Sequence, residues 1–210
     1  MASDISGHHE RLAHDDRRDE IIDAVRAVVA ESGISRLSIS AVTKRVGCTR
    51  SLFYHYFPTK EDALQAALDQ SIDAFMAQLT AWNDQRVTGD IEGALNSAAH
   101  MLKTLVLQQD DAMPHTVATG GNAGLYATFV HRVADRTARY ICQSTVVDFA
   151  ALHEVRIDHL YETFYVLITG LVMFVRANPD VPEETVKDII ASTLHIEGYT
   201  AKYPERRPTR

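Results

Sequence analysis

The amino-acid sequence predicts an all-α protein in which a three-helix N-terminal unit continues, through a long helix, into a C-terminal helical bundle. Three observations support this class. Apolar residues recur three and four positions apart along almost the whole chain, and the alternation typical of strands is nearly absent. The prolines fall at or beyond the ends of these periodic segments. The composition, 46% hydrophobic and 23% charged over 210 residues, is that of a globular protein with a sizeable core.

The first predicted helix covers residues 17–32. Its apolar face consists of five aliphatic residues, Ile21, Ile22, Val25, Val28 and Val29. Gly33 follows where helices often end with a left-handed residue. Residues 1–15 are polar and rich in histidine, and we predict a disordered tail there.

Two short helices follow. Ser38 is a favourable N-cap for a helix over residues 39–46, and Gly47 permits the positive φ of a tight turn. Thr49 can then cap a third helix of residues 49–55. The sequence therefore predicts helix, glycine turn and helix within fewer than twenty residues.

The fourth helix is predicted to be long. Thr59 and Asp62 resemble a capping box directly after Pro58, and apolar spacing continues from there to about Asp84. Because this helix runs from the small unit into the bundle, we expect it to join the two as a continuous rod rather than as a flexible linker.

The rest of the chain is predicted to form a bundle. Its expected helices cover residues 91–105, 124–145, 153–177 and 182–198. The predicted organisation is a tail of residues 1–15, an N-terminal domain of residues 16–62, a larger domain of residues 63–202 and a flexible tail of residues 203–210. No internal repeat is evident.

Positive charge is concentrated in one short segment. Residues 36–60 contain five basic side chains and no Asp or Glu, whereas the whole chain has 21 Lys and Arg against 28 Asp and Glu. The formal net charge is −7, so the remainder of the protein is strongly acidic. Bulk acidity argues against a protein that coats nucleic acid with its whole surface, but it allows a small basic module on an acidic body.

The basic segment coincides with the two short helices. Two short helices joined by a three-to-four-residue turn that contains glycine define a helix-turn-helix. In such a motif the first turn of the second helix enters the major groove, and here that turn comprises Thr49, Arg50, Ser51 and Leu52. Arg50 can pair with guanine, Ser51 can donate or accept a hydrogen bond, and Leu52 can contact a thymine methyl group. These features predict binding to double-stranded DNA.

Side chains around the turn can hold phosphates. Lys44, Tyr54, His55 and Lys60 supply positive charge or hydrogen bonds. The absence of carboxylates within the segment removes repulsion from the duplex, and helix N-termini such as the one at Ser38 favour anions. A plain three-helix packing unit is the alternative, but such a unit does not require the local excess of positive charge.

The segment TKRVGCTRSLFYHYFPTKEDAL resembles the DNA-binding signature of the TetR/AcrR-like family of one-component transcriptional regulators. The matching positions are Gly47, Thr49, Tyr54, Phe57, Lys60, Ala63 and Leu64, preceded by Gly33. The resemblance covers about residues 17–65. It departs at Val46 and Cys48, and also at Ser51–Leu52, which replaces a common Gly-Thr pair. Because this last pair lies at base-facing positions, the operator sequence of relatives does not transfer.

The resemblance implies roles for individual residues. Arg50, Ser51 and Leu52 would face bases. Phosphates would be held by Tyr54, His55 and Lys60, and by Ser38 and Ser40 at the start of the second helix. It further implies a ligand-responsive regulator, most often a repressor, that binds a palindromic operator.

The resemblance also implies a homodimer joined through the last two long helices. Both helices offer wide apolar surfaces, and Gly170 would permit close approach of two copies. A two-fold dimer predicts half-sites about 34–36 Å apart for each helical turn of DNA that separates them.

In regulators of this kind a small-molecule effector in the C-terminal bundle changes the spacing of the DNA-binding heads. Polar or soft residues on otherwise apolar segments are candidates for the lining of such a pocket. They are His100, Met101, Tyr126, Phe129, His131, Tyr165, Thr169 and Met173. Each of them is also compatible with an ordinary core or surface position.

The alternative is an all-α protein without a DNA role, either an enzyme or an adaptor. The sequence has no HExxH or GxSxG motif and no phosphate-binding glycine loop after a strand, so we expect no catalytic residue. Ten histidines raise the hypothesis of a metal sensor, but no two of them lie three or four residues apart on a clearly predicted helix. We therefore expect neither a metal site nor a cofactor.

The expected location is the cytoplasm. The N-terminus lacks the apolar segment of a signal peptide, and the longest apolar run, residues 164–175, is too short to span a bilayer. Cys48 and Cys142 lack metal-type spacing and suit a reducing compartment. We therefore expect no membrane partner.

Overall fold

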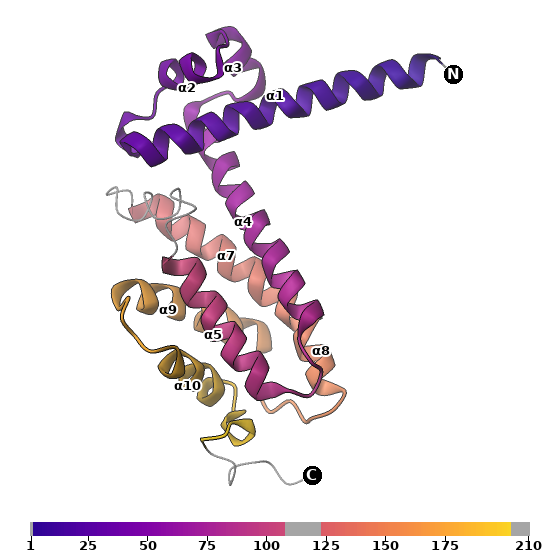
Figure 1. The fold of residues 1–210 in the computed structure, drawn as a ribbon, viewed down its shortest axis with the longest axis vertical. Helices are drawn as coiled ribbons and strands as arrows, with labels where there is room; N and C mark the ends of the chain where they lie inside the picture. Colours follow the sequence, from indigo (N-terminus) through magenta and orange to yellow (C-terminus); the bar gives the residue numbers. More distant parts are fainter. Residues whose placement is uncertain (1, 108–122, 203–210) are drawn as a thin grey trace. The chain divides into compact units, whose positions relative to one another are not determined.

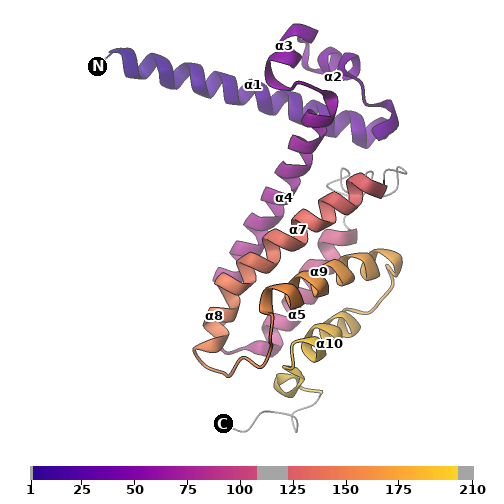
Figure 2. The ribbon, with the colours of Figure 1, turned by 180° about the vertical axis from the view of Figure 1, so that it is seen from behind.

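The computed structural model of the protein describes residues 2–107 and 123–202, with side chains from residue 16 onward. Within these ranges the chain forms helices and connecting segments without any strand, which confirms the all-α class (Figure 1, and Figure 2 from behind). The described chain divides into two compact units. The first holds residues 2–73 and 123–126, and the second holds residues 74–107 and 127–202.

Helix α1 (Ala2–Ser32) begins earlier than predicted. The backbone of residues 2–15 is helical, whereas the sequence predicted a disordered tail there. Extending an existing helix costs much less free energy than nucleating one, and no proline interrupts this segment. The helix ends as predicted, because Gly33 follows it with φ 81°.

The first unit is built on the apolar face of α1. All five aliphatic residues predicted for that face are buried, namely Ile21, Ile22, Val25, Val28 and Val29. After the 3-10 turn η1 (Ile34–Arg36), helix α2 (Ile39–Val46) packs against α1, and α3 (Arg50–Tyr56) packs against α2. Val42 and Phe53 are fully buried by this packing.

Helix α4 (Lys60–Gln85) starts with the predicted capping box. The Asp62 amide donates to the Thr59 hydroxyl at 3.1 Å, and the Asp62 carboxylate accepts from the Thr59 amide at 3.0 Å. The first turns of α4 bury Ala63, Leu64, Ala67, Leu68 and Ile72. The first unit extends through Asp73, so it includes these residues of α4. The boundary between domains at residues 62 and 63 stays a prediction.

Within the described residues, the second unit contains the end of α4 and the α-helices that follow, except for the first four residues of α7, which belong to the first unit. The described α-helices after α4 are α5 (Ile91–Leu107), α7 (Ala123–Gln143), α8 (Thr145–Ala150), α9 (Leu160–Ala177) and α10 (Glu183–Thr193), followed by the 3-10 turn η2 (Glu197–Tyr199). Helices α5, α9 and α10 pack on one another around Ala99, Leu171, Val175 and Val186. This core explains why the apolar spacing of all three helices is readable in the sequence.

Two helix boundaries in this unit differ from the prediction. A single helix was predicted over residues 153–177, but α9 begins only at Leu160. His159 precedes it with φ 55°, a left-handed conformation that stops a helix arriving from the N-terminal side. Similarly, α10 ends at Thr193, because His195 has φ 55°. Helix α8 was not predicted as a separate element, and the predicted tail at 203–210 lies outside the described residues.

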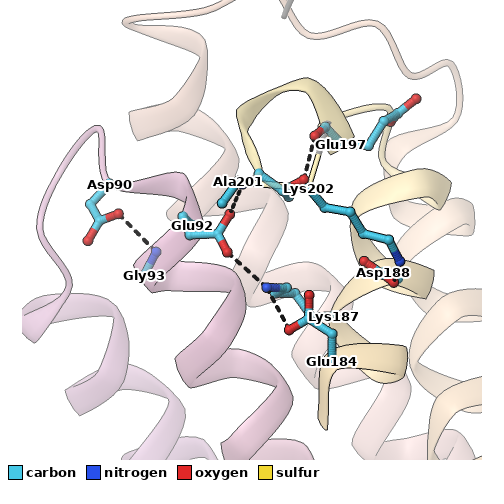
Figure 3. A network of polar contacts seen from close by, with 10 residues as sticks. Asp90, Glu92, Gly93, Glu184, Lys187, Asp188, Glu197, Ala201 and Lys202 are labelled. Atoms are coloured by element: carbon cyan, nitrogen blue, oxygen red, sulfur yellow. Dashed lines mark hydrogen bonds and ion pairs between the residues drawn. The ribbon is translucent and has the colours of Figure 1, made fainter. Parts of the chain in front are cut away.

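A polar network fastens α10 to α5 (Figure 3). Lys187 is buried, and its Nζ lies 2.8 Å from carboxylate oxygens of both Glu92 and Glu184. The other oxygen of Glu92 accepts a hydrogen bond from the Ala201 amide at 2.9 Å. Glu92 therefore links α5 to α10 and to the segment that follows η2.

The network shifts the titration of its members. The hydrogen bond from Lys187 lowers the pKa of Glu92 below its ordinary value, and the smaller effect of burial opposes this. Burial disfavours the charged form of Lys187, but its hydrogen bonds to Glu184 and Glu92 outweigh burial and raise its pKa. Both groups therefore stay charged at neutral pH.

Candidate nucleic-acid interface and ligand cavity

The predicted helix-turn-helix is present in the first unit. The Ser38 hydroxyl caps α2 by accepting from the Ala41 amide at 3.2 Å. Gly47 ends α2 in the left-handed conformation, with φ 73° and ψ 34°, and the next amide, that of Cys48, donates to the Thr43 carbonyl at 3.0 Å. The local sequence thus sets both the length of α2 and the sharp change of direction after it.

Helix α3 starts at the next cap. The Thr49 hydroxyl accepts from the Leu52 amide at 3.2 Å, and the Phe53 side chain anchors the helix in the core. With Phe53 pointing inward, Arg50, Ser51 and Tyr54 remain exposed. The first turn of α3 is therefore accessible from solvent, as contact with base edges requires.

The structure brings the predicted DNA-binding residues onto these helices and their flanks. The exposed ones are Ser38, Ser40, Lys44, Thr49, Arg50, Ser51, Tyr54 and His55, whereas Leu52 and Lys60 are half-buried. None of the ten is buried, so each can reach a ligand outside the protein. Their roles in binding remain a prediction.

Arg50 and Lys60 each donate a hydrogen bond within the unit. The Arg50 guanidinium donates to the Ser40 hydroxyl, so a base-facing candidate on α3 is held beside a phosphate-facing candidate on α2. The Lys60 ammonium donates to the Leu37 carbonyl at 3.2 Å. Lys60 therefore also fastens the start of α4 to the segment before α2.

Glu31 of α1 reduces the local excess of positive charge. It pairs with Arg45 of α2, with 2.8 Å between the guanidinium and the carboxylate. The sequence did not indicate this partner because it lies outside the acid-free segment of residues 36–60. Lys44 and Arg50 lie on the same two short helices, but Glu31 pairs with Arg45 and not with them.

The second unit contains a partly open cavity of about 240 Å³. The end of α4 and helices α5, α7, α8, α9 and α10 contribute to its walls, together with η2. Most of the lining is apolar, for example Leu79, Leu95, Ile141, Phe164 and Leu171. A cavity with such walls favours an apolar occupant.

An ion pair forms part of the lining. The Arg86 guanidinium pairs with the Asp148 carboxylate, and its Nε donates to the Asn83 side-chain carbonyl at 3.1 Å. Asn83 also accepts a hydrogen bond from the Thr145 hydroxyl at 2.7 Å. The Arg86 side chain is only 10% exposed, so these partners satisfy a charge that would otherwise be costly to bury.

Three aromatic rings meet at another part of the lining. The His153 ring lies 4.8 Å from the ring centres of both Phe149 and Tyr199. The Tyr199 hydroxyl is 3.2 Å from Nδ1 of His153. This group combines a flat apolar surface with a hydrogen-bonding pair.

Only one of the eight predicted effector residues lines this cavity, and it is Met101. His100 is exposed and pairs with Glu183, while Met173 is 49% exposed on α9. His131 and Tyr165 contact each other, with 2.7 Å between Nδ1 and the hydroxyl, but they do so away from the cavity. The other residues that do not line it are Tyr126, Phe129 and Thr169.

The cavity residues that the sequence did not indicate come from distant segments. Trp82 belongs to the end of α4 and Arg86 directly follows that helix, while Asp148 and Phe149 belong to α8 and Tyr199 to η2. Taken singly, each resembles an ordinary helix-end residue. Their convergence depends on the connections around α8 and α9, where the predicted helix boundaries were wrong.

Helix α9 presents an unusual apolar surface. Val166 is 67% exposed and Phe174 38%, and Gly170 lies between them without any other group within 4 Å of the position a Cβ would take. The helix is apolar and long enough to cross a membrane, with mean hydropathy 1.4, but a core helix of a globular protein passes the same test. Only 17% of its residues are buried within the protomer.

Comparison with known proteins agrees with this architecture. Residues 21–67 match the family model described as bacterial regulatory proteins, tetR family. No curated protein matches the chain.

Solved structures share the fold. The multidrug binding protein EbrR, complexed with imidazole, is 19% identical with a TM-score of 0.61, over 85% of this chain and 94% of its own. RolR, complexed with resorcinol, is 21% identical with a TM-score of 0.59, over 95% and 98%. A TetR transcription regulator from Haloarcula marismortui is 19% identical with a TM-score of 0.58, over 86% and 97%. At these identities the likeness establishes the fold.

A capped helix-turn-helix with an exposed second helix, on an all-α chain of this fold, defines a DNA-binding transcriptional regulator. The N-terminal domain of this protein belongs to the tetR family of bacterial regulatory proteins, as the match over residues 21–67 shows.

Proposed function

We propose that the protein is a ligand-responsive transcriptional repressor that binds a palindromic operator as a homodimer in the cytoplasm. The observation that carries the proposal is the exposed first turn of α3, held in place by the buried Phe53. Arg50 and Ser51 would read bases from this turn, while Lys44, Tyr54 and the capped N-terminus of α2 would contact phosphates.

The apolar surface of α9 supports a homodimer. Val166, Met173 and Phe174 are too exposed for an isolated protomer, and a groove beside them extends to Ile189 and Thr193 of α10. A second copy of the chain can cover this surface, with Gly170 allowing the two helices to approach closely. A two-fold arrangement then requires a palindromic operator.

Release by an effector is supported by the cavity of the second unit. The structures of EbrR with imidazole and of RolR with resorcinol show that proteins of this fold bind small molecules. Helix α4 starts directly after the helix-turn-helix at Lys60, and its last turns contribute Leu79 and Trp82 to the cavity. A ligand that favours a different position of α4 would therefore lower the affinity for the operator.

Selection of bound duplexes from random DNA tests the proposal. The purified full-length chain is expected to enrich a palindrome, and its affinity should fall steeply with salt because phosphate contacts release counterions. Enrichment of nothing, or binding that does not respond to salt, would rule out the DNA role. Recovery of a protein partner after nuclease treatment would instead favour an adaptor.

A further inference from the structure

The charged groups in the lining of the cavity are already engaged in contacts within the protein. Five charged residues contribute to the lining, and each already has a partner. Arg86 pairs with Asp148, and Arg156 pairs with Glu154 at 2.8 Å. The Asp90 carboxylate accepts from the Gly93 amide at 2.9 Å at the start of α5.

A charged ligand would have to compete with one of these existing contacts or enter without a counter-charge. Either choice is unfavourable in an apolar site, because a desolvated charge needs a partner. The apolar walls and the existing contacts of the charged groups therefore disfavour both carboxylates and amines.

The volume limits the size of the occupant. A cavity of about 150 Å³ lined by apolar side chains holds benzene, which has six non-hydrogen atoms. Scaled by volume, the 240 Å³ cavity holds roughly ten such atoms. Pockets for drug-sized molecules usually exceed 300 Å³, so this site suits a smaller molecule.

One part of the lining offers a ligand both a hydrogen-bonding pair and an aromatic surface. Tyr199 and His153 form a hydroxyl–imidazole pair in the lining, and Phe149 completes an apolar surface beside it. A hydroxyl or carbonyl oxygen on the ligand can hydrogen-bond there while its apolar part contacts the rings. The remaining walls are mainly aliphatic and offer little further specificity.

From the engaged charges, the volume and the position of the polar pair, we propose that the cavity binds an uncharged, mainly apolar molecule of about ten non-hydrogen atoms with one hydroxyl or carbonyl group beside Tyr199 and His153. Simple alkylphenols have this chemistry. The inference rests on the proposed function, since it names the class of effector for that site.

Calorimetric titration of the full-length protein with four matched probes tests the class. The probes are 4-propylphenol, propylbenzene, 4-propylbenzoate and 4-propylbenzylamine, of which the last two are charged at neutral pH. We expect 4-propylphenol to bind most tightly, propylbenzene roughly three- to tenfold more weakly for want of the hydrogen bond, and both charged probes more weakly still. Equal or tighter binding of a charged probe, or no binding of 4-propylphenol, would overturn the inference.

Two variants locate the hydrogen bond. Tyr199→Phe keeps the ring and removes the hydroxyl, so the affinity advantage of 4-propylphenol over propylbenzene should shrink, while the affinity for propylbenzene should not change. Tyr165→Phe is the matched control, since that hydroxyl contacts His131 away from the cavity. Quenching of Trp82, the single tryptophan of the chain and part of the lining, should accompany binding in all three proteins. Unchanged 4-propylphenol affinity in Tyr199→Phe would contradict the polar part of the inference.

The proposed DNA role and the proposed ligand class can be refuted independently of each other. Operator binding is measured without any probe, so its absence refutes the DNA role while calorimetry still decides the ligand class. If the operator is bound and the charged probes prove the better ligands, the ligand class is refuted and the DNA role stands.

Discussion

At the scale of single residues, Arg50 is the side chain on which sequence discrimination is expected to depend most. It lies in the exposed first turn of α3, and the hydroxyl of Ser40 accepts a hydrogen bond from its guanidinium in the DNA-free protein. This contact restricts the guanidinium before DNA arrives, which reduces the conformational entropy lost on binding. The sequence indicated that Lys60 only holds a phosphate, but its ammonium also donates a hydrogen bond to the Leu37 carbonyl.

We predict that Arg50→Ala lowers operator affinity by about 1–3 kcal/mol and relaxes the preference at one base pair. The exposed Lys44 provides the matched control, and Lys44→Ala should weaken binding to all duplexes alike and reduce the salt slope by about 1. Fluorescence anisotropy with a set of single-base operator variants measures both effects. An Arg50→Ala protein with unchanged affinity and base preference would exclude Arg50 from the reading surface.

Glu92 is the side chain whose loss we expect to affect the stability of the fold. It is the only link between Lys187, a buried cation of α10, and helix α5 among the contacts shown in Figure 3. We predict that Glu92→Gln lowers the free energy of unfolding by about 1–3 kcal/mol, since Lys187 keeps Glu184 as its remaining partner. Urea unfolding followed by circular dichroism measures the loss. The exposed Glu154, paired with Arg156, is the control, and Glu154→Gln should change stability by less than about 1 kcal/mol.

The same carboxylate predicts a pH dependence. The folded-state pKa of Glu92 is depressed, so the folded protein holds this proton less tightly than the unfolded chain. Its contribution is therefore fully present above the ordinary carboxyl pKa of about 4.3 and is lost as the pH falls towards the folded value. The stability difference between wild type and Glu92→Gln should shrink over that acidic range. A difference that stays constant down to pH 3 would contradict this assignment.

At the scale of elements, the angle between α2 and α3 depends on one backbone conformation. Gly47 has φ 73°, which costs a residue with a Cβ about 1–2 kcal/mol. We predict that Gly47→Ala destabilises the protein by about this amount and weakens operator binding, even though a Cβ there meets nothing within 4 Å. Gly124→Ala, at a helical position with equally open space, should leave both properties unchanged or raise stability slightly. Thermal unfolding measures the stability of both variants, and fluorescence anisotropy measures their operator affinity. Equal effects of the two substitutions would exclude backbone strain as the cause.

The surface of α9 is the second feature at this scale. Gly170→Leu adds a side chain where the protomer has open space, so the folded protomer should tolerate it while close approach of a second copy should not. We predict a shift from dimer to monomer in sedimentation velocity, with little change in helical content. Val166→Glu should act in the same direction, because it places a charge on the same surface.

Val147 of α8 supplies the control for this test. It is 57% exposed, similar to Val166, but it does not belong to the α9 surface. Val147→Glu should therefore remain dimeric. Dissociation of the Val147 variant, or a wild-type chain that sediments as a monomer, would contradict dimerisation through α9.

At the scale of the whole molecule, DNA and ligand are expected to compete through the conformation of the chain. The net charge of −7 limits non-specific attraction to DNA, so the local basic surface and base contacts must provide the affinity. Linkage then requires reciprocity: if a ligand lowers operator affinity by some factor, operator DNA lowers ligand affinity by the same factor.

We predict that saturating operator duplex weakens binding of 4-propylphenol by the same factor by which 4-propylphenol weakens operator binding. Titrations of each ligand at fixed concentrations of the other measure the two factors. A scrambled duplex of equal length is the control and should have little effect. Operator affinity that does not change at saturating 4-propylphenol would refute coupling between the two sites.

The sequence predicted much of the first unit because its determinants are local. Caps at Ser38 and Thr49, the left-handed glycine at 47 and the capping box at Thr59 each act within a few residues, and all are present in the structure. The second unit was predicted less well. Its connections depend on left-handed His159 and His195, residues that rarely adopt this conformation and that no local pattern indicated.

By itself, the sequence determined the helical class, the helix-turn-helix and the position of its basic residues, because helix periodicity and capping depend on neighbours in the chain. Only the tertiary structure decided which residues line the cavity and which polar or charged side chains pair with each other. Arg86 with Asp148, Glu92 with Lys187, and Tyr199 with His153 are each brought together across long stretches of chain. Such pairs form through packing of whole helices, and no spacing rule along the chain encodes them.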